Sequence, residues 1–308
     1  MKSKRTGGLA TSIYLIALGI VDSGLLFFFL LVDTIPGNNP SVKNTYSYAA
    51  FFSYFGFPLF FFFIVASIWV MVGVTITRFI MVKFPIKAKD WCSAKRAYIG
   101  IGATMVATFI INFPHFFNYR PVKVAGGYQL QMTEYGKSES AQMYEFWIHC
   151  MILVLVPWAT IAFLNASIIY ALVKRTKYMQ GLDKTASSKP ERNKQDQQMT
   201  TILLTVTFTF LILLALQCIT QCFFMLGNGK KNVSWDQNSV STAFAFAKMG
   251  VVINSAINCF LYCFTGSVFR KELKKMFACK PSRQYAAYSN TSKASRGDTN
   301  ETYTESKA

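Results

Sequence analysis

Charge is scarce in this sequence. Only 15% of its 308 residues are Asp, Glu, Lys or Arg, whereas 52% are hydrophobic and 29 are phenylalanine. A soluble domain of this length needs many more charged residues to cover its surface. The deficit therefore excludes an ordinary soluble protein. It also argues against nucleic-acid binding, because the sequence contains no basic soluble domain that could do it.

Residues that carry metal or catalytic chemistry are also few. The sequence has two histidines, His115 and His149, and no CxxC or Cys/His cluster with metal-ligand spacing. The HExxH and GxSxG motifs are absent, as are paired catalytic carboxylates, so we expect neither an enzyme nor a resident cofactor. None of the seven cysteines lies in an expected extracellular loop, so no disulfide framework is predicted. We expect both histidines to be interfacial side chains.

Long apolar segments are what the sequence has instead. A helix of about 20 apolar residues crosses a hydrocarbon core of roughly 30 Å, and a helix satisfies its own backbone in lipid. No alternating strands of the membrane-barrel type are visible. The sequence therefore predicts an all-α membrane protein. Its six expected spans are Thr11–Val32, Phe51–Ile76, Ala97–Phe117, Phe146–Val173, Met199–Leu226 and Val240–Phe264.

Lysine and arginine are unevenly shared between the connections of these spans. The N-terminal residues and the connections Arg78–Arg96 and Lys174–Gln198 carry 16 of them, against 6 in the alternate connections. Cytosolic loops are enriched in these residues, so both ends of the chain are expected in the cytosol. Anionic lipid would attract this basic face. We expect Lys174–Gln198 to be a mobile loop, because it is polar and basic.

The C-terminal residues predict two further features. Residues 267–279 place apolar side chains on one side of a helix and basic ones on the other, which is typical of an amphipathic helix on the inner leaflet. Cys279 at its end is a candidate for palmitoylation. Residues 281–308 are rich in Ser and Thr, and we expect a disordered cytosolic tail that a kinase can phosphorylate.

One carboxylate lies in the middle of an expected span. A charge at that depth costs about 2.5–3.5 kcal/mol on insertion scales, so Asp22 is expected to face the bundle and to have partners. We expect it to be the only carboxylate inside a span. In the last span Asn254 and Asn258 share a helix face, with Ser255 beside them. Two interpretations stay open, hydrogen bonds between helices or a polar pocket that holds a cation or a proton.

Several motifs together resemble those of the rhodopsin-like (class A) G-protein-coupled receptors. The residues from Leu15 to Asp22 are similar to the second-helix motif of that family. Thr77–Phe79 resembles its Asp/Glu-Arg-Tyr, and Asn258–Tyr262 resembles its Asn-Pro-x-x-Tyr. The flanks VKFPIKAKDWCSAKRA and NSAINCFLYCFTGSVFRKEL are similar to invertebrate FMRFamide and neuropeptide receptors. The resemblance implies a seven-helix bundle with six spans present and the first helix of the family missing, as in a fragment.

The resemblance also implies roles for individual residues. The implied sodium pocket comprises Asp22, Ser67, Asn254 and Asn258. The implied activation relay comprises Ile68, Pro157, Phe210 and Tyr262. Arg78 would contact a heterotrimeric G protein, and Phe60 and Gln217 would line the ligand pocket, where Phe60 argues against a monoamine. The other implied partners are an extracellular peptide, membrane lipids, and a kinase and arrestin at the tail of a multi-pass plasma-membrane protein.

Some positions depart from the family pattern. Thr77 replaces an acidic residue, so the intrahelical ion pair that would hold Arg78 inactive cannot form, and we expect raised basal activity. Ser53 aligns with one cysteine of the family's extracellular disulfide. The loop Asn118–Met143 has no cysteine either, which leaves the anchoring of that loop open. Cys259 occupies the position of the proline in the family's last motif. Leu214 and Leu216 occupy positions where the family usually has an aromatic residue and a proline.

The favoured function is that of a neuropeptide receptor that transmits ligand binding to a heterotrimeric G protein by opening of the helix bundle. A six-helix transporter or channel is the first alternative. It would call for inverted repeats or a charged pore lining, and the sequence has neither. A truncated receptor fragment that does not signal is the second alternative.

Overall fold

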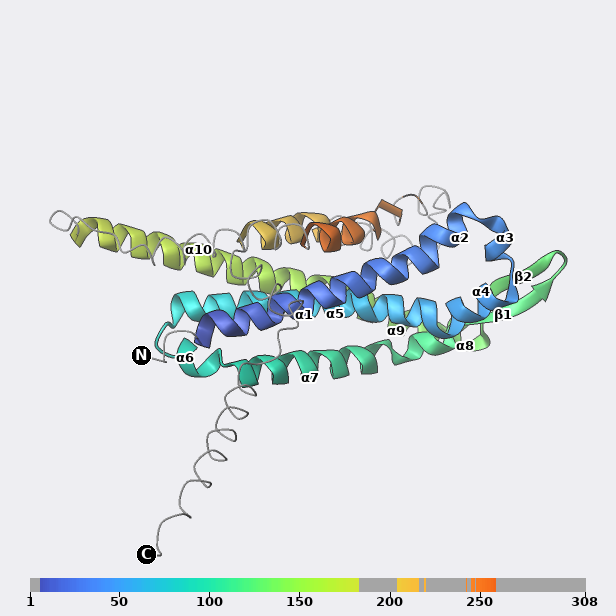
Figure 1. Ribbon diagram of the computed structural model, residues 1–308, viewed down its shortest axis with the longest axis horizontal. Coiled ribbons are helices and arrows are strands. Elements are labelled where there is room, and N and C mark those ends of the chain that lie inside the picture. The colour runs from blue at the N-terminus through green and yellow to red at the C-terminus, as the bar shows by residue number, and fades with distance from the viewer. Residues whose placement is uncertain are drawn as a thin grey trace, which may run out of the picture. The chain divides into compact units, whose positions relative to one another are not determined.

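The computed structural model describes residues 6–182, 204–215, 219, 242, 245–246 and 248–258. Long helices run side by side in it, with a β-hairpin at one end (Figure 1). The chain divides into Met1–Gly266 and Ser267–Ala308, and every described residue belongs to the first unit. The predicted amphipathic helix and tail lie outside the described residues, as do Gln217, Tyr262 and Cys279.

The elements follow in chain order. The first part of the chain forms α1 Thr6–Phe29, η1 Leu30–Thr34, α2 Ile35–Asn38, α3 Pro40–Lys43, α4 Tyr46–Phe51, η2 Phe52–Gly56, α5 Phe57–Lys83 and α6 Ala88–Trp91. The next part forms α7 Ala94–Asn112, η3 Phe113–Phe117, β1 Tyr119–Val124, β2 Gly127–Met132, α8 Glu134–Lys137, α9 Glu139–Trp147, η4 Ile148–Leu155 and α10 Val156–Leu182. Residues 204–215 and 248–258 are also helical.

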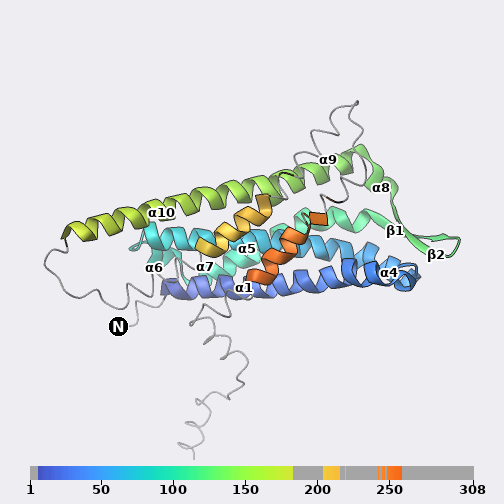
Figure 2. The ribbon, with the colours of Figure 1, turned by 90° about the horizontal axis from the view of Figure 1, so that it is seen from above.

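Helix α5 lies at the centre of the described bundle. It packs against α1, α7 and α10, and α1 also packs against α7 (Figure 2). Burial agrees with this arrangement, because 61% of the apolar window of the α5 span is buried, against 17% for the α7 span. The exposed apolar side chains of α7 are those expected of a helix that faces lipid.

Four described helical stretches are long and apolar enough to cross a membrane: Leu9–Asn38, Tyr46–Lys83, Ala94–Phe117 and Met151–Lys174. They overlap the first four predicted spans, and the first three of them begin earlier than predicted. The other two predicted spans are described only in part, where they are helical. The expectation of a loop from Lys174 is wrong at its start, because α10 continues to Leu182. Residues 174–180 contain neither glycine nor proline, so nothing ends the helix there.

Prolines shape three of these helices in the same way. The described residues contain three π-helical stretches, η1, η2 and η4, and the second residue after each is a proline, Pro36, Pro58 or Pro157. A proline has no backbone N–H and its ring collides with the carbonyl four residues earlier, so the turn before it must widen. For Pro36 that carbonyl belongs to Val32, and the Tyr48 hydroxyl donates to it over 2.9 Å.

The expectation of an all-α protein is wrong at one place. Strands β1 and β2 pair antiparallel, with Val124 opposite Gly127. A two-residue turn joins them, and Gly126 has a φ of 97°, a backbone region that favours glycine. Loops are predicted from their polar residues, but here a short turn brings two alternating segments into a hairpin.

The hairpin is held to the bundle without a disulfide. Tyr119 packs edge-to-face on Phe52 and Phe57, with ring centroids 5.8 and 4.9 Å apart, and Tyr128 packs on Tyr46. The backbone N–H of Tyr128 donates to the carbonyl of Asn44 over 2.9 Å. Aromatic pairs contribute about 0.5–1.5 kcal/mol each beyond the area they bury. They supply the loop anchoring that the missing cysteines left open.

Candidate functional site

Asp22 is the centre of a buried polar cluster. Its side chain is 1% exposed, in the middle of α1. The Ser67 hydroxyl of α5 donates to Asp22 Oδ1 over 2.5 Å, and the Asn258 amide Nδ2 donates to Asp22 Oδ2 over 3.2 Å. The structure therefore gives both carboxylate oxygens a donor. The cluster joins α1, α5 and the helix of residues 248–258, and it brings together three of the four residues that the resemblance implied for the sodium pocket.

Asn254 and Ser255 are two further buried polar residues on the helix that carries Asn258. Asn254 is buried one helical turn before Asn258, and its Oδ1 atom has no hydrogen-bond partner among the described residues. Ser255, the next residue, is also buried. A carboxylate with neighbouring hydroxyl and amide oxygens is a donor set that suits a hard cation. These residues therefore fit a sodium ion.

Three of the four predicted relay residues are buried, and the fourth, Tyr262, lies outside the described residues. Ile68 is 4% exposed and follows Ser67 in α5, and Phe210 is fully buried. Pro157 is buried near the start of α10. There the Trp158 indole N–H donates to the carbonyl of Leu211 over 3.1 Å, which ties α10 to the helix of residues 204–215. These contacts place the three predicted residues on packed helices.

Arg78 lines a small cavity. Its side chain is 7% exposed, near the end of α5. The cavity has a volume of about 10 Å³, which is close to the smallest space that holds one water molecule. The residues that line it come from α5, α10 and the helix of residues 204–215, and they are Val74, Thr75, Arg78, Asn165, Ile168, Leu204 and Thr207. The Asn165 amide donates to the Thr207 hydroxyl over 2.8 Å across one wall.

The residue before this arginine forms a bond within its own helix. The Thr77 hydroxyl donates to the carbonyl of Val74 over 2.7 Å. The Thr77 carbonyl in turn accepts a weak bond from the Cys92 thiol at 3.9 Å. Burial raises the pKa of that thiol, and the nearby Arg78 guanidinium lowers it by a smaller amount. Arg78 thus shares its surroundings with the connection between α5 and α7.

The aromatic side chains near the hairpin form a dense layer. Phe60, a predicted ligand contact, is 6% exposed and packs on Phe29 and Phe61. His115 is also buried, with Phe61 at 4.9 Å and the Asn118 amide 3.3 Å from its Nδ1 atom. The expectation that His115 is interfacial is therefore wrong. Phenylalanines of α5 enclose its ring, and Asn118 supplies its polar partner.

One ion pair was missed by sequence reasoning. The Lys248 ammonium contacts the Asp33 carboxylate, and the two side chains are 38% and 42% exposed. Asp33 lies inside the span Leu9–Asn38, so Asp22 is not the only carboxylate in a span. The predicted first span ended one residue before Asp33. A lysine within an expected apolar span was the signal that could have revealed the pair.

Comparison with known families agrees with this geometry. The profile described as "7 transmembrane receptor (rhodopsin family)" matches residues 1–262. The chain belongs to this family. Members are receptors and not enzymes, and they cross the membrane several times. The receptor assignment replaces the transporter alternative, and it confirms the resemblance of the chain to the rhodopsin-like family.

The chain is similar in sequence to three named receptors. The "FMRFamide peptide receptor frpr-18" of Caenorhabditis elegans is 27% identical over 179 residues, which cover 56% of this chain and 41% of that protein. The "FMRFamide receptor" of Drosophila melanogaster is 24% identical over 261 residues, covering 81% and 45%. "Probable G-protein coupled receptor 142" of Mus musculus is 26% identical over 211 residues, covering 68% and 51%. The receptor spans about half the length of these relatives.

Proposed function

We propose that this receptor binds an extracellular neuropeptide at the plasma membrane and transmits the binding to a heterotrimeric G protein. The observation that carries the proposal is the Asp22 cluster, in which two oxygens of one buried carboxylate tie α1, α5 and the helix of residues 248–258 together. A buried carboxylate is tolerated in a span where it has a function and partners. The relatives named FMRFamide receptors favour a peptide ligand.

The helix bundle is the element that would change state. Arg78 is buried beside the small cavity between α5, α10 and the helix of residues 204–215. If these helices part, the guanidinium becomes accessible to the G protein, and Tyr262 would support that arrangement. Peptide and G protein each bind the open arrangement better, so each raises the affinity for the other.

The Asp22 cluster would hold the closed arrangement. The residues proposed to hold a sodium ion are Asp22, Ser67 and Asn254, with Asn258 donating to the carboxylate. Bound sodium supplies a positive charge that offsets the buried carboxylate. Because the donors come from different helices, separating the helices would take the cluster apart. Ile68, Pro157 and Phe210 are buried, and ligand binding would reach the cluster through them.

The remaining expectations belong to the cytosolic side of the proposal. Both ends of the chain would be cytosolic, as the lysine and arginine distribution indicates. Residues 267–279 would lie on the inner leaflet, with Cys279 palmitoylated. The Ser/Thr-rich tail from residue 281 would be phosphorylated by a kinase and then bind arrestin. Phe60 and Gln217 would face the peptide.

A G-protein activation assay in cells tests the proposal. The chain is expressed with labelled Gα and Gβγ subunits, and amidated peptides are applied. We expect at least one peptide to separate the subunits, and Arg78→Ala to abolish that response at equal surface expression. Lys174→Ala is the matched control, because Lys174 is exposed on α10 and its loss removes the same charge. If no peptide activates any G-protein class, or if Arg78→Ala responds like the wild type, the proposal is wrong.

A further inference from the structure

The connection between α5 and α7 presents an unusual surface. It contains six lysines and arginines from Arg78 to Arg96 and a single acid, Asp90. Large apolar side chains are exposed among these charges, with Ile86 89% and Trp91 48% exposed. A soluble loop would bury such side chains or lack them. Basic and aromatic residues together are typical of a segment at a membrane surface.

Its lysines are placed against aromatic rings. The Lys83 ammonium lies 5.2 Å from the ring centroid of Phe79 and 5.7 Å from that of Phe84. The Lys87 ammonium lies 5.5 Å from the ring centroid of Trp91. Cation–π contacts of this kind stabilise the position of a charge by about 0.5–1 kcal/mol at exposed sites. They hold the two ammonium groups at the rim of the bundle.

The inner side of this connection is fixed to the bundle. Ala88 and Cys92 are 6% and 2% exposed and belong to one buried cluster with Ala10, Ile13 and Ala97. The backbone N–H groups of Ala88 and Cys92 donate to the carbonyls of Phe84 and Ala88 over 2.9 Å. The short helix α6 therefore presents its exposed side chains in one arrangement, without the cost of ordering a flexible loop.

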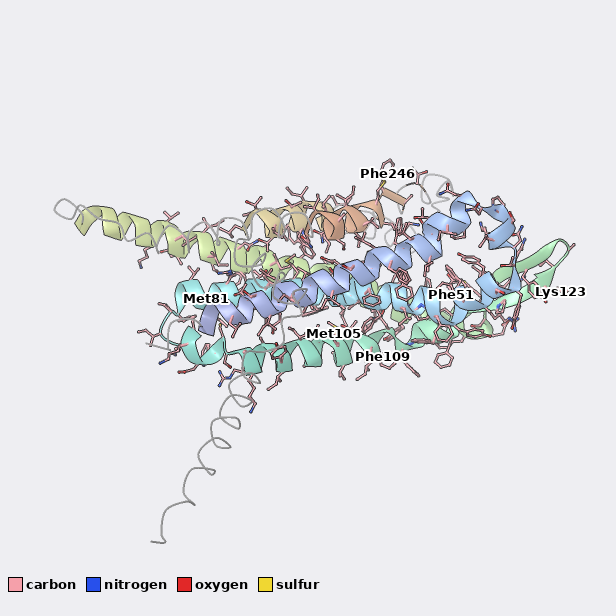
Figure 3. The ribbon with its side chains drawn as sticks, in the orientation of Figure 1. Phe51, Met81, Met105, Phe109, Lys123 and Phe246 are labelled. Atoms are coloured by element: carbon pink, nitrogen blue, oxygen red, sulfur yellow. The ribbon has the colours of Figure 1, made fainter. Side chains whose placement is uncertain are left out.

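The depth of these residues also suits a lipid headgroup. The α5 span ends at Lys83, and the next span begins at Ala94. The residues between them therefore lie where the hydrocarbon core gives way to headgroups. Met81 and Lys123 mark opposite ends of the bundle (Figure 3), and the α6 connection lies at the Met81 end.

We propose that Lys83, Lys87 and Trp91 form a binding site for an anionic phospholipid headgroup. The inference rests on the proposed orientation, which puts α6 at the cytosolic leaflet, where anionic lipids are concentrated. The two ammonium groups donate to the phosphate oxygens, and the Trp91 ring lies among the glycerol and upper acyl carbons. The excess of positive charge calls for an anionic partner, and the depth of these residues at the level of the headgroups favours a lipid as that partner. A lipid bound here would contact the connection that lies against Arg78.

Native mass spectrometry of the purified full chain tests this site. Phosphatidylserine or a phosphatidylinositol bisphosphate is titrated against the wild type and the double variant Lys83→Gln/Lys87→Gln. We expect the double variant to bind the anionic lipid about twenty-fivefold more weakly, since each of the two basic residues near an anionic surface contributes on the order of a factor of five. Phosphatidylcholine should bind both proteins alike. Trp91→Leu should weaken the binding of the anionic lipid as well.

The control variant is Arg120→Gln/Lys123→Gln, which removes two exposed charges at the hairpin end. Equal losses in the two double variants would mean general charge attraction, and would overturn the site. Unchanged lipid binding in Lys83→Gln/Lys87→Gln would also overturn it, and reduced capture of purified G protein in the same variant would then assign the surface to a protein partner. The assay needs neither peptide nor signalling, so a chain that binds lipid but activates no G protein contradicts only the proposed function.

Discussion

A β-carbon on Gly73 would lie only 2.6 Å from the Cε1 atom of Tyr14. The tyrosine ring of α1 thus occupies a space on α5 that only glycine leaves open. Gly100 of α7 has the same relation to this ring, because a β-carbon there would collide with the Tyr14 hydroxyl oxygen. One side chain therefore joins three helices, and the absence of two β-carbons makes the contact possible.

Replacing Gly73 with alanine should destabilise the receptor. Overpacking a tight contact costs about 1–3 kcal/mol, whereas alanine within a helix gains up to about 1 kcal/mol over glycine. We expect a lower unfolding temperature in detergent for Gly73→Ala. Gly102→Ala is the control, because a β-carbon there meets nothing within 4 Å, and it should be neutral or stabilising. In a Tyr14→Ala background, Gly73→Ala should no longer cost stability; a persisting loss would contradict the contact.

The hairpin should loosen when its aromatic anchors are removed. Tyr119→Ala and Tyr128→Ala each delete a ring that packs on the bundle. Hydrogen exchange of the amides of β1 and β2 should then become faster, by about fivefold or more for the loss of roughly 1 kcal/mol. Gln129→Ala, at an exposed position of β2, should leave exchange unchanged. Unaltered protection in both tyrosine variants would show that other contacts hold the hairpin.

The ion pair between Asp33 and Lys248 should contribute modestly to stability. Both side chains are more than a third exposed, so solvent screening limits the pair to about 1 kcal/mol or less. Asp33→Lys and Lys248→Asp should each lower the unfolding temperature, since each places like charges together. The swapped double variant should recover most of the loss. If the unfolding temperature of the double variant falls by the sum of the two single decreases, the residues do not act as a pair.

The Asp22 cluster could be predicted from sequence because the physical constraint is severe. A carboxylate in a span must have partners, and amides one helical turn apart are natural donors. The Asp33 and Lys248 pair could not be found in the same way. Asp33 lies inside its span but in the last part of it, where a charge costs less than at the centre, and its partner comes from a helix more than 200 residues away in the sequence. Only the packing of the two helices brings the charges together.

Local geometry was the part of the fold that sequence reasoning missed. Pro157 predicts a disturbed helix, but the π-helical turn before it depends on how the backbone hydrogen bonds rearrange around the missing N–H. The hairpin was missed because a polar segment between two apolar spans was interpreted as a loop. The contact between Tyr14 and Gly73 was missed because a glycine in an apolar helix gives no sign of what lies opposite.

A carboxylate at position 77 should reduce signalling without agonist. The Thr77 hydroxyl bonds to its own helix and leaves no acidic neighbour before Arg78 in the sequence. Thr77→Glu would supply a charge that favours the closed arrangement, and we expect basal G-protein activation to fall about fivefold, the effect of roughly 1 kcal/mol of coupling. Thr77→Gln has the same size without the charge and should keep the basal level. Equal output from all three proteins would refute raised basal activity.

Sodium should stabilise the receptor through Asp22 and not through Asp33. At a sodium concentration about tenfold above the dissociation constant, binding adds about 1.4 kcal/mol. The unfolding temperature should then rise by roughly 2–4 °C. We expect this rise when sodium chloride replaces choline chloride at constant ionic strength. Asp22→Asn should abolish it, and Asn254→Ala should reduce it, because the Asn254 oxygen is the donor that no described group engages.

Asp33→Asn is the matched control for this measurement. It removes the other carboxylate of the same span, which already has Lys248 as its partner. Its sodium response should therefore equal that of the wild type, although its overall stability is lower. Because both variants lose one negative charge, a general salt effect would change them alike. Loss of the sodium response in Asp33→Asn, or its survival in Asp22→Asn, would show that sodium does not bind at the Asp22 cluster.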